Sequence, residues 1–180
     1  MRFTLLLAAT FACATVNANP FINAQIGVGS EKANKVSVGY AIDKHALSLG
    51  YMATDGKSDL SYSGGSSVVT EQDKAEAEFV TLDYSYTFGS FDGFDMFMNA
   101  AVGFGNSDNT RTTTDTGSSD STSSKTEHTS SYYGLHFGLS RTFESVDGLS
   151  LYGLVGVESY DYETFDNSGL AGNVGLRYTF

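Results

Sequence analysis

The sequence predicts an all-β protein, an eight-stranded antiparallel up-and-down transmembrane β-barrel. First, eight segments alternate apolar residues with small or polar ones at a period of two, the pattern of strands with two unlike faces. Second, the polar positions are mostly Gly, Ser, Asn and Thr, which suits a narrow lumen better than a charged soluble surface. Third, short and long connections alternate along the chain.

Composition excludes several other classes of protein. A chain of 180 residues with 13 Phe and 11 Tyr is sufficient for one folded domain and too aromatic for a disordered protein. Its net charge of −11 argues against a nucleic-acid partner. No apolar run is long enough for a transmembrane helix. The single cysteine, Cys13, allows no disulfide framework, and we predict neither a metal site nor a cofactor.

The N-terminal segment 1–18 is predicted to be a secretory signal peptide that is cleaved after its last residue. Arg2 supplies the positive charge, residues 3–12 form the apolar run, and residues 16–18 end in small side chains. The alternative is a lipoprotein anchor at Cys13, against which the bulky Phe11 argues. Export would carry the remaining chain through the periplasm to the cell outer membrane.

The mature domain, 19–180, begins with four predicted strands. In the first, Ile, Ala and Val alternate with Asn, Gln and Gly; in the second, Val, Tyr and Ile alternate with Ser, Gly and Ala. The third sets Leu and Tyr against Ser and Gly, and the fourth sets Val, Leu, Tyr and Phe against Thr, Asp and Ser. These strands span 22–29, 36–42, 47–51 and 80–88.

Four further strands follow with the same alternation. The fifth places Phe, Met, Ala and Val opposite mostly small or polar residues, and the sixth places Tyr, Leu and Phe opposite Gly, His and Ser. The seventh is less regular, and the eighth sets Leu, Val, Tyr and Phe against Ala, Asn, Gly, Arg and Thr. Most segments are long enough for a tilted strand to cross a bilayer. These strands span 94–105, 133–140, 149–158 and 170–180.

Aromatic residues cluster near the strand ends on the apolar face, as expected for girdles at the two membrane interfaces. One predicted girdle consists of Tyr84, Tyr86, Phe88, Phe94, Phe143, Tyr178 and Phe180, and the other of Tyr51, Phe104 and Tyr133.

The connections divide into two kinds. Those at 43–45, 89–93 and 144–148 are short, and two of them contain the Asp-Gly turn signal. Those at 55–74 and 106–131 are long. With both termini on the short-turn side, we expect the long connections to face outside the cell.

The last residues of the chain carry a family resemblance. A terminal Phe, a Tyr two residues before it and apolar residues further back resemble the outer-membrane assembly signal: Val174, Leu176, Tyr178 and Phe180. With eight strands and a signal peptide, the chain resembles the small OmpX/OmpA-type barrels of Gram-negative outer membranes. The resemblance implies recognition by the barrel-assembly machinery and a surrounding of outer-membrane lipid and lipopolysaccharide. We expect no peptidoglycan-binding domain of the kind that OmpA-like proteins carry.

Ionisable residues on the predicted lumen face should be paired, because a lone buried charge is costly. We predict a polar network that includes an ion pair across the lumen between Arg177 and one of two aspartates at its depth, Asp83 in preference to Asp95. Either a structural network or a proton-sensitive gate is consistent with these residues. The predicted members are Asp83, Asp95, Asn99, His136, Glu158 and Arg177, with Tyr132, Tyr152 and Tyr160 near His136 and Glu158.

The only candidate for catalysis is the pair His128 and Ser130, which is similar to the His-x-Ser pair of lipid A deacylase barrels. A catalytic acid would have to come from Glu127 or Glu158. The pair lies in a Ser/Thr tract, where such a match arises easily by chance. We therefore predict that the protein is not an enzyme.

The segment 106–131 has 16 Ser or Thr among 26 residues and no apolar side chain. It is either a mobile loop or a hairpin that continues the flanking strands, and its threonines favour the hairpin. With 55–74, which contains Tyr62, Val68 and Val69, it could contact host or extracellular-matrix molecules.

The sequence thus predicts a surface-exposed structural or interaction protein of the adhesion type. A small-solute pore, a lipid A-modifying hydrolase and a soluble periplasmic lipid-binding barrel remain as alternatives.

Overall fold

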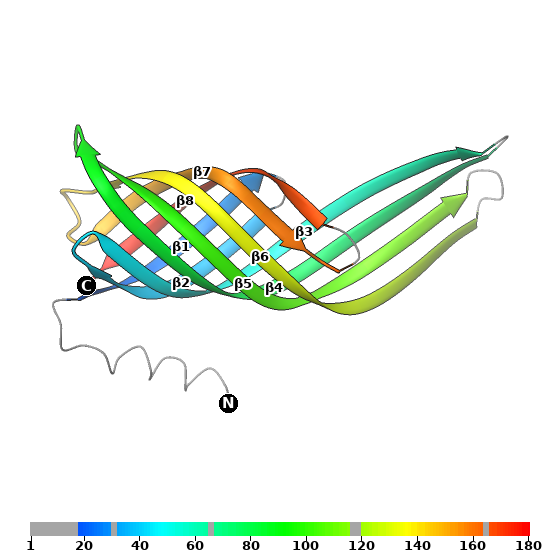
Figure 1. The fold of residues 1–180 in the computed structure, drawn as a ribbon, viewed down its shortest axis with the longest axis horizontal. Helices are drawn as coiled ribbons and strands as arrows, with labels where there is room; N and C mark the ends of the chain where they lie inside the picture. Colours follow the sequence, from blue (N-terminus) through cyan, green and yellow to red (C-terminus); the bar gives the residue numbers. More distant parts are fainter. Residues whose placement is uncertain (1–17, 30–31, 65–66, 116–119, 164–165) are drawn as a thin grey trace, which may run out of the picture.

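The chain folds into a closed barrel of eight antiparallel strands (Figure 1). The computed structural model describes residues 18–29, 32–64, 67–115, 120–163 and 166–180. Each strand pairs with its neighbour in sequence, and the last pairs with the first, which confirms the predicted up-and-down topology. The strands are β1 (Asn19–Gly29), β2 (Lys32–Ile42), β3 (His45–Gly64), β4 (Ser67–Phe91), β5 (Phe94–Asp115), β6 (Asp120–Thr142), β7 (Leu149–Asp161) and β8 (Asp166–Thr179).

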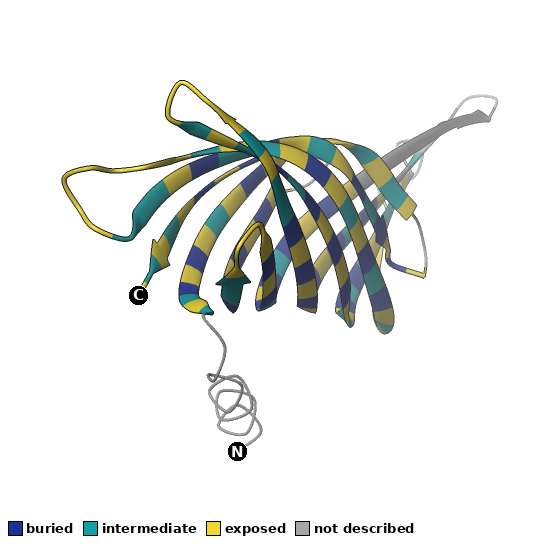
Figure 2. Cartoon of the chain, turned by 60° about the vertical axis from the view of Figure 1, so that its left-hand side comes forward, coloured by how far each residue is buried: buried dark blue, intermediate teal, exposed yellow. Residues whose placement is uncertain are grey.

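The barrel is apolar outside and mostly polar or aromatic inside. Burial alternates residue by residue along the strands (Figure 2). Leu170 and Phe104 face outward and are 79% and 62% exposed, whereas Thr81 and Asn173 face the lumen and are buried. An apolar outer band of this kind is covered by lipid in transmembrane barrels. The structure therefore confirms which residues of each strand were predicted to face outward and which were predicted to face the lumen.

Three short turns join the strands at one end of the barrel, where β1 begins and β8 ends; we call it the terminus end. Asp43, Asp92, Gly93 and Gly148 all have positive φ there. At the β4–β5 turn two consecutive residues, Asp92 and Gly93, have φ of 50° and 77°, as tight hairpin turns require. Aspartate tolerates this region better than most residues, and glycine does so without strain.

At the opposite end, β3 to β6 continue well beyond the other four strands. β3 pairs with β4 as far as Gly64 and Ser67, and β5 pairs with β6 as far as Asp115 and Asp120. β4 and β5 also stay paired as far as Val69 and Asp115. A single four-stranded sheet results, which we call the sheet extension: residues 55–64, 67–76, 106–115 and 120–130.

The sheet extension corrects one prediction and decides another. Residues 55–74, predicted as a long loop, belong almost entirely to β3 and β4. For 106–131, the hairpin rather than the mobile loop is observed. Polar composition alone suggested loops, but backbone pairing across four strands satisfies the N–H and C=O groups, and threonine suits exposed strands.

The sheet extension has two open edges. The pairing of β2 with β3 ends at Lys32 and Asp55, and that of β7 with β6 ends at Asp161 and Ser131. Beyond these residues β3 and β6 have a strand neighbour on one side only, among the described residues. The sheet extension therefore stands on one side of the barrel mouth (Figure 1).

Some predictions concern residues that lie outside the described ones. These are the signal peptide, apart from its last residue, and the side chains of Tyr62, Val68 and Val69. Within the described ranges, no helix combines the length and the hydropathy needed to cross a membrane.

Candidate functional site

Aromatic side chains fill the lumen toward the sheet extension. Phe79 from β4 contacts Tyr132 from β6 and Tyr160 from β7, each with ring centroids 6.2 Å apart. The rings of Tyr132 and Tyr160 are 5.0 Å apart, and Tyr162 stacks nearly parallel on Tyr160 at 6.1 Å. All four side chains are buried. This aromatic cluster occupies the cross-section of the lumen instead of leaving a channel.

Tyr162, which directly follows β7, covers the cluster at the extension end. Its backbone carbonyl accepts a hydrogen bond of 2.8 Å from Asn109 Nδ2, and its hydroxyl lies 3.2 Å from Thr54 Oγ1. These contacts tie the segment after β7 to β3 and β5 across the mouth. The lumen is closed on this side by side chains from several strands.

A polar cluster surrounds Glu158 beside the aromatic rings. His136 Nε2 lies 2.9 Å from Glu158 Oε1, and Asn173 Nδ2 donates to the same oxygen at 3.1 Å. The hydroxyls of Tyr132 and Tyr160 donate to Oε1 and Oε2 at 3.3 and 2.8 Å. Four partners satisfy this buried carboxyl group, as its burial requires. The structure thus brings His136 and Glu158 together with two of the three tyrosines named from sequence.

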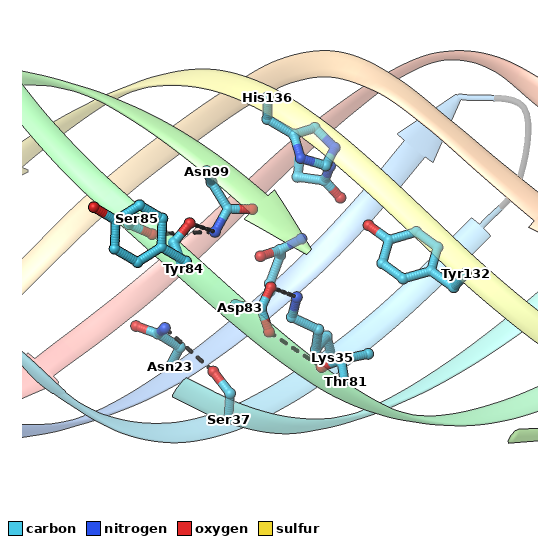
Figure 3. A network of polar contacts seen from close by, with 12 residues as sticks. Asn23, Lys35, Ser37, Thr81, Asp83, Tyr84, Ser85, Asn99, Tyr132 and His136 are labelled. Atoms are coloured by element: carbon cyan, nitrogen blue, oxygen red, sulfur yellow. Dashed lines mark hydrogen bonds and ion pairs between the residues drawn. The ribbon is translucent and has the colours of Figure 1, made fainter. Parts of the chain in front are cut away.

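The principal ion pair of the lumen joins Lys35 to Asp83 (Figure 3). Lys35 Nζ lies 2.5 Å from Asp83 Oδ1, and Thr81 Oγ1 donates to Oδ2 at 3.1 Å. Lys35 was not among the predicted lumen residues, because the second strand was expected to start one residue later. The alternation of β2, extended back through Ala33, places Lys35 on the inward face.

The predicted ion pair between Arg177 and Asp83 is wrong, because Lys35 occupies that position. Arg177 Nε donates to Asn23 Oδ1 at 3.0 Å, and its guanidinium lies 4.5 Å from the centre of the Phe21 ring. A cavity of about 20 Å³ lined by both Arg177 and Asp83 lies between the two. Lateral stagger between distant strands decides this pairing, and alternation along one strand does not reveal it.

Two further predicted network members differ in placement. Asn99 is buried, and its Nδ2 donates to Ser85 Oγ at 3.1 Å (Figure 3). Asp95 lies at the rim of the terminus end and is exposed, so it is not a member of the buried network. Asn23 and Ser37, which were not predicted, are hydrogen-bonded at 3.2 Å.

His128 and Ser130 lie at the opposite mouth and bond to different partners. His128 Nδ1 lies 2.9 Å from Glu163 Oε2, and Ser130 Oγ donates to Ser107 Oγ at 2.7 Å. Neither acid named from sequence is this partner: Glu127 is on the other face of β6, and Glu158 contacts His136. Ser130 is 2% exposed and faces inward, away from the lipid side.

Two rows of residues, all but one of them charged, cross the outer face of the sheet extension. In one row, Asp55, Glu76, Asp108 and Glu127 are direct neighbours on β3 to β6. Two residues further out, a second row consists of Lys57, Lys74, Thr110 and Lys125. We call them the charged rows. They depend on the register of four strands, so the sequence alone could not reveal them.

Ion pairs connect the charged rows. Lys74 Nζ contacts Glu76 Oε1, and Lys125 Nζ lies 2.9 Å from Asp108 Oδ2. The Lys74 ammonium holds the pKa of Glu76 below its ordinary value, and Glu76 in turn raises the pKa of Lys74. Asp108 likewise raises the pKa of Lys125. These pairs reduce the repulsion that like charges on adjacent strands would cause.

The closed ring of eight antiparallel strands, apolar outside and mostly polar or aromatic inside, is the fold of small transmembrane β-barrels. Among the described residues, no three His, Cys, Asp or Glu side chains are placed to share a metal ion. Neither a protein-family model nor a curated protein matches the sequence.

Solved structures show the same fold. The N-terminal β-barrel domain of Pseudomonas aeruginosa OprF is 16% identical, with 90% of this chain and 97% of that chain covered and a TM-score of 0.56. Outer membrane protein H (OprH) from P. aeruginosa is 12% identical, with coverages of 91% and 100% and a TM-score of 0.54. A major outer membrane protein from Thermus thermophilus is 13% identical, with coverages of 89% and 99% and a TM-score of 0.52. The resemblance to small outer-membrane barrels is confirmed for the fold.

Proposed function

We propose that this protein is an integral outer-membrane protein that acts at the cell surface as a structural and interaction protein of the adhesion type. The observation that carries the proposal is the sheet extension, which continues four strands past the rest of the barrel and has no strand paired to either edge within the part of the chain that the structure describes. The proposed role is non-catalytic.

The edge formed by β6 is suited to adding a strand from a partner. Residues 121–130 are mostly Ser and Thr, contain no Pro, and pair only with β5 among the described residues. An edge strand of this kind offers free backbone groups to an extended segment. The charged rows end on this edge at Glu127 and Lys125, so a basic residue opposite the first and an acidic residue opposite the second would be favoured.

The orientation in the membrane follows from the two ends of the barrel. Outer-membrane barrels have short turns on the periplasmic side and long connections outside. The three short turns lie at the terminus end, so the sheet extension would face the exterior. Export by the signal peptide and recognition of Val174, Leu176, Tyr178 and Phe180 by the barrel-assembly machinery belong to the same proposal. Lipopolysaccharide would surround the barrel, and a host or extracellular-matrix molecule would be the partner.

The alternative functions receive less support. A pore needs a lumen that is open from end to end, but the aromatic cluster, which includes Tyr162, blocks it. A lipid A hydrolase needs its serine on the lipid side, but Ser130 is buried and faces inward. A soluble lipid-binding barrel needs an apolar interior, whereas the large apolar side chains Ile26 and Val155 lie on the outside.

The orientation can be tested with single cysteines, because Cys13 is the only cysteine and lies within the predicted signal peptide. Ser123→Cys, on the outer face of β6, should react with a membrane-impermeant maleimide on intact cells. Ser145→Cys, in the β6–β7 turn, should react only after the outer membrane is opened. The reverse pattern would contradict the proposed orientation.

The edge itself can be tested with proline. Ser123→Pro and Ser124→Pro each remove one backbone N–H. Neighbouring N–H groups of a strand point alternately to its two sides, here toward β5 and toward the open edge. One of the two variants therefore removes a donor at the open edge. That variant should fold normally and lose adhesion of cells to extracellular-matrix proteins. Ser123→Ala and Ser124→Ala keep both donors and should adhere like the parent. Full adhesion of both folded proline variants would refute the role of this edge.

A further inference from the structure

A pocket of about 160 Å³ opens at the terminus end of the lumen, opposite the sheet extension. This volume is far above the roughly 10–15 Å³ that one water needs. Six Ser and Thr side chains from four strands line it, together with Tyr152: Ser85 and Thr87 from β4, Ser140 and Thr142 from β6, Ser150 from β7 and Thr179 from β8. Arg177 contributes a guanidinium to the same lining. Neither the barrel's closure nor the proposed surface function requires this combination.

Arg177 has no carboxylate within ion-pair distance among the residues that the structure describes. Its Nε donates to Asn23, and its guanidinium lies against the Phe21 ring and 5.8 Å from the centre of the Tyr152 ring. The nearby carboxylate of Asp83 is held by Lys35 and Thr81. Asn23 and Phe21 thus hold the guanidinium of Arg177 in place, and no described carboxylate pairs with it to neutralise its charge beside the pocket.

The other charged residues of the pocket lie at its rim. Asp43, Lys44 and Asp95 are all exposed to solvent, whereas Arg177 is only partly exposed. The formal charges of these four residues sum to zero. Solvent and salt screen the rim charges more strongly than the arginine, so the inner part of the pocket remains attractive to anions.

We propose that this pocket binds a small oxyanion of the phosphate class. Guanidinium groups form strong charge-assisted hydrogen bonds with phosphate oxygens. A phosphate group has more acceptor oxygens than the guanidinium alone can satisfy. The hydroxyls of Ser140 and Thr179 supply further donors, and the Thr142 and Ser150 hydroxyls, which share a hydrogen bond of 3.0 Å, leave one more O–H between them. In the proposed orientation the pocket faces the periplasm, where the phosphate could be free or part of a lipid headgroup.

The binding can be measured by NMR on the refolded barrel in uncharged detergent micelles, titrated with inorganic phosphate. We expect saturable shifts of the Ser150 and Thr179 amide signals, which sit on two strands of the pocket. Arg177→Gln should weaken binding by about tenfold or more, because it removes a charged hydrogen-bond donor. Arg111→Gln removes an arginine at the opposite end and should leave binding unchanged.

Two further variants keep the test decisive if Arg177→Gln does not fold. Ser140→Ala and Thr179→Val each remove one hydroxyl from the lining and should each weaken binding severalfold. Absence of saturation in the parent protein, unchanged binding in these variants, or equal shifts with chloride at matched ionic strength would each overturn the proposal.

A second arm distinguishes the two sources of phosphate. The barrel is placed in nanodiscs of phosphatidylcholine with or without phosphatidylglycerol. If phosphatidylglycerol shifts the Ser150 and Thr179 signals and prevents further shifts by inorganic phosphate, the ligand is a lipid headgroup. If inorganic phosphate shifts them equally in both kinds of disc, the ligand is free phosphate. Both outcomes support an oxyanion site, and neither depends on the proposed adhesion.

Discussion

Lys35 and Asp83 show how the barrel accommodates buried charge at the scale of single residues. Each side chain is buried, and the carboxylate receives one bond from an ammonium and one from the Thr81 hydroxyl. Taking either charge out of water alone would be expensive, while the pair can be tolerated. The two residues lie on β2 and β4, so the contact also spans β3, which separates them in the ring.

Removal of one partner from this pair should therefore be costly. Lys35→Met leaves Asp83 buried without its counter-charge, and we expect a loss of about 3–5 kcal/mol in the free energy of unfolding. Urea titration of the refolded barrel in lipid vesicles would measure it. The double variant Lys35→Met with Asp83→Leu should recover most of the loss.

A matched control for this prediction is Lys32→Met, since Lys32 lies on the same strand but is exposed. Its effect should be within about 0.5 kcal/mol. Equal losses for Lys32→Met and Lys35→Met would show that the buried ion pair has no special importance.

Glycines mark the places where neighbouring backbones come too close for a side chain. A Cβ built on Gly105 would lie 1.7 Å from the backbone oxygen of Glu78, whereas one built on Gly172 would meet nothing closer than 3.8 Å. We expect Gly105→Ala to destabilise the barrel by about 1–3 kcal/mol through overpacking. Gly172→Ala should be close to neutral. The same urea titration compares them, and equal stability of both variants would contradict the close approach.

At the scale of elements, the sheet extension is held together by backbone pairing and by ion pairs on both of its faces. Its inner face has the bidentate pair of Arg111 and Asp73, with N–O distances of 2.8 and 2.9 Å. Its outer face has the charged rows. Backbone pairing across four strands is the common framework for both. Stability of this element should thus depend on pH and salt more than that of the barrel.

The pH dependence has a definite sign. The pKa of Glu76 in the folded protein is below its ordinary value of 4.5, so its stabilisation is present above that value and is lost as the pH falls through the lowered pKa. The pKa of Lys74 is above 10.5, so its share is present below 10.5 and is lost as the pH rises through the raised pKa. We expect amide protection in β4 near these residues to decrease at both extremes.

Hydrogen exchange corrected for intrinsic rates would measure this protection. Lys74→Met should remove the pH dependence that Glu76 and Lys74 share. Lys44→Met, at the terminus end, serves as the control and should leave it unchanged. A parent profile in β4 that is flat from pH 3 to pH 12 would rule out a contribution from the pair.

At the scale of the whole molecule, the barrel combines a filled interior with an apolar exterior. Interior contacts involve all eight strands, so they should form only when the ring closes. The aromatic cluster and the Glu158 cluster block one half of the lumen, and Phe97, Tyr152 and Leu154 form a second buried cluster between them and the pocket at the terminus end. A filled eight-stranded barrel has no aqueous channel.

Reconstitution into planar bilayers should therefore give no conductance steps above background. The measurement needs barrel that migrates differently on a gel before and after boiling, which shows that it is folded. Reproducible steps from such material would mean that the aromatic cluster opens.

Deletion of Phe180 should lower the amount of folded barrel in the outer membrane. The terminal aromatic is the last residue of the segment that resembles the assembly signal, and its ring packs edge-on against Tyr178 at 5.1 Å. Heat-modifiable migration of outer-membrane fractions would measure the yield. Phe180→Tyr keeps an aromatic ring and should assemble better than the deletion, and equal yields of the deletion and the parent would refute the role of Phe180.

The sequence was sufficient to predict the strands, their inward and outward faces and the short turns, because alternation and Asp-Gly turns are local signals. It was not sufficient to predict side-chain contacts across the lumen, because these depend on how strands that are not neighbours are shifted relative to one another. Arg177 was therefore assigned to Asp83, although Lys35 reaches that carboxylate. Glu163 was missed as the partner of His128 because it lies after β7, outside any alternating segment. The charged rows required the register of four strands.

The one-sided position of the sheet extension gives the molecule a front and a back within the plane of the membrane. On the side of β7, β8, β1 and β2 the strands end near the barrel mouth, so a neighbouring molecule meets only the barrel. On the side of β3 to β6 it also meets the sheet extension with its charged rows. The molecule therefore does not present the same surface as it rotates about the membrane normal. In a crowded membrane, its rotational angle decides which neighbours can approach it and which face of the sheet extension a partner can reach.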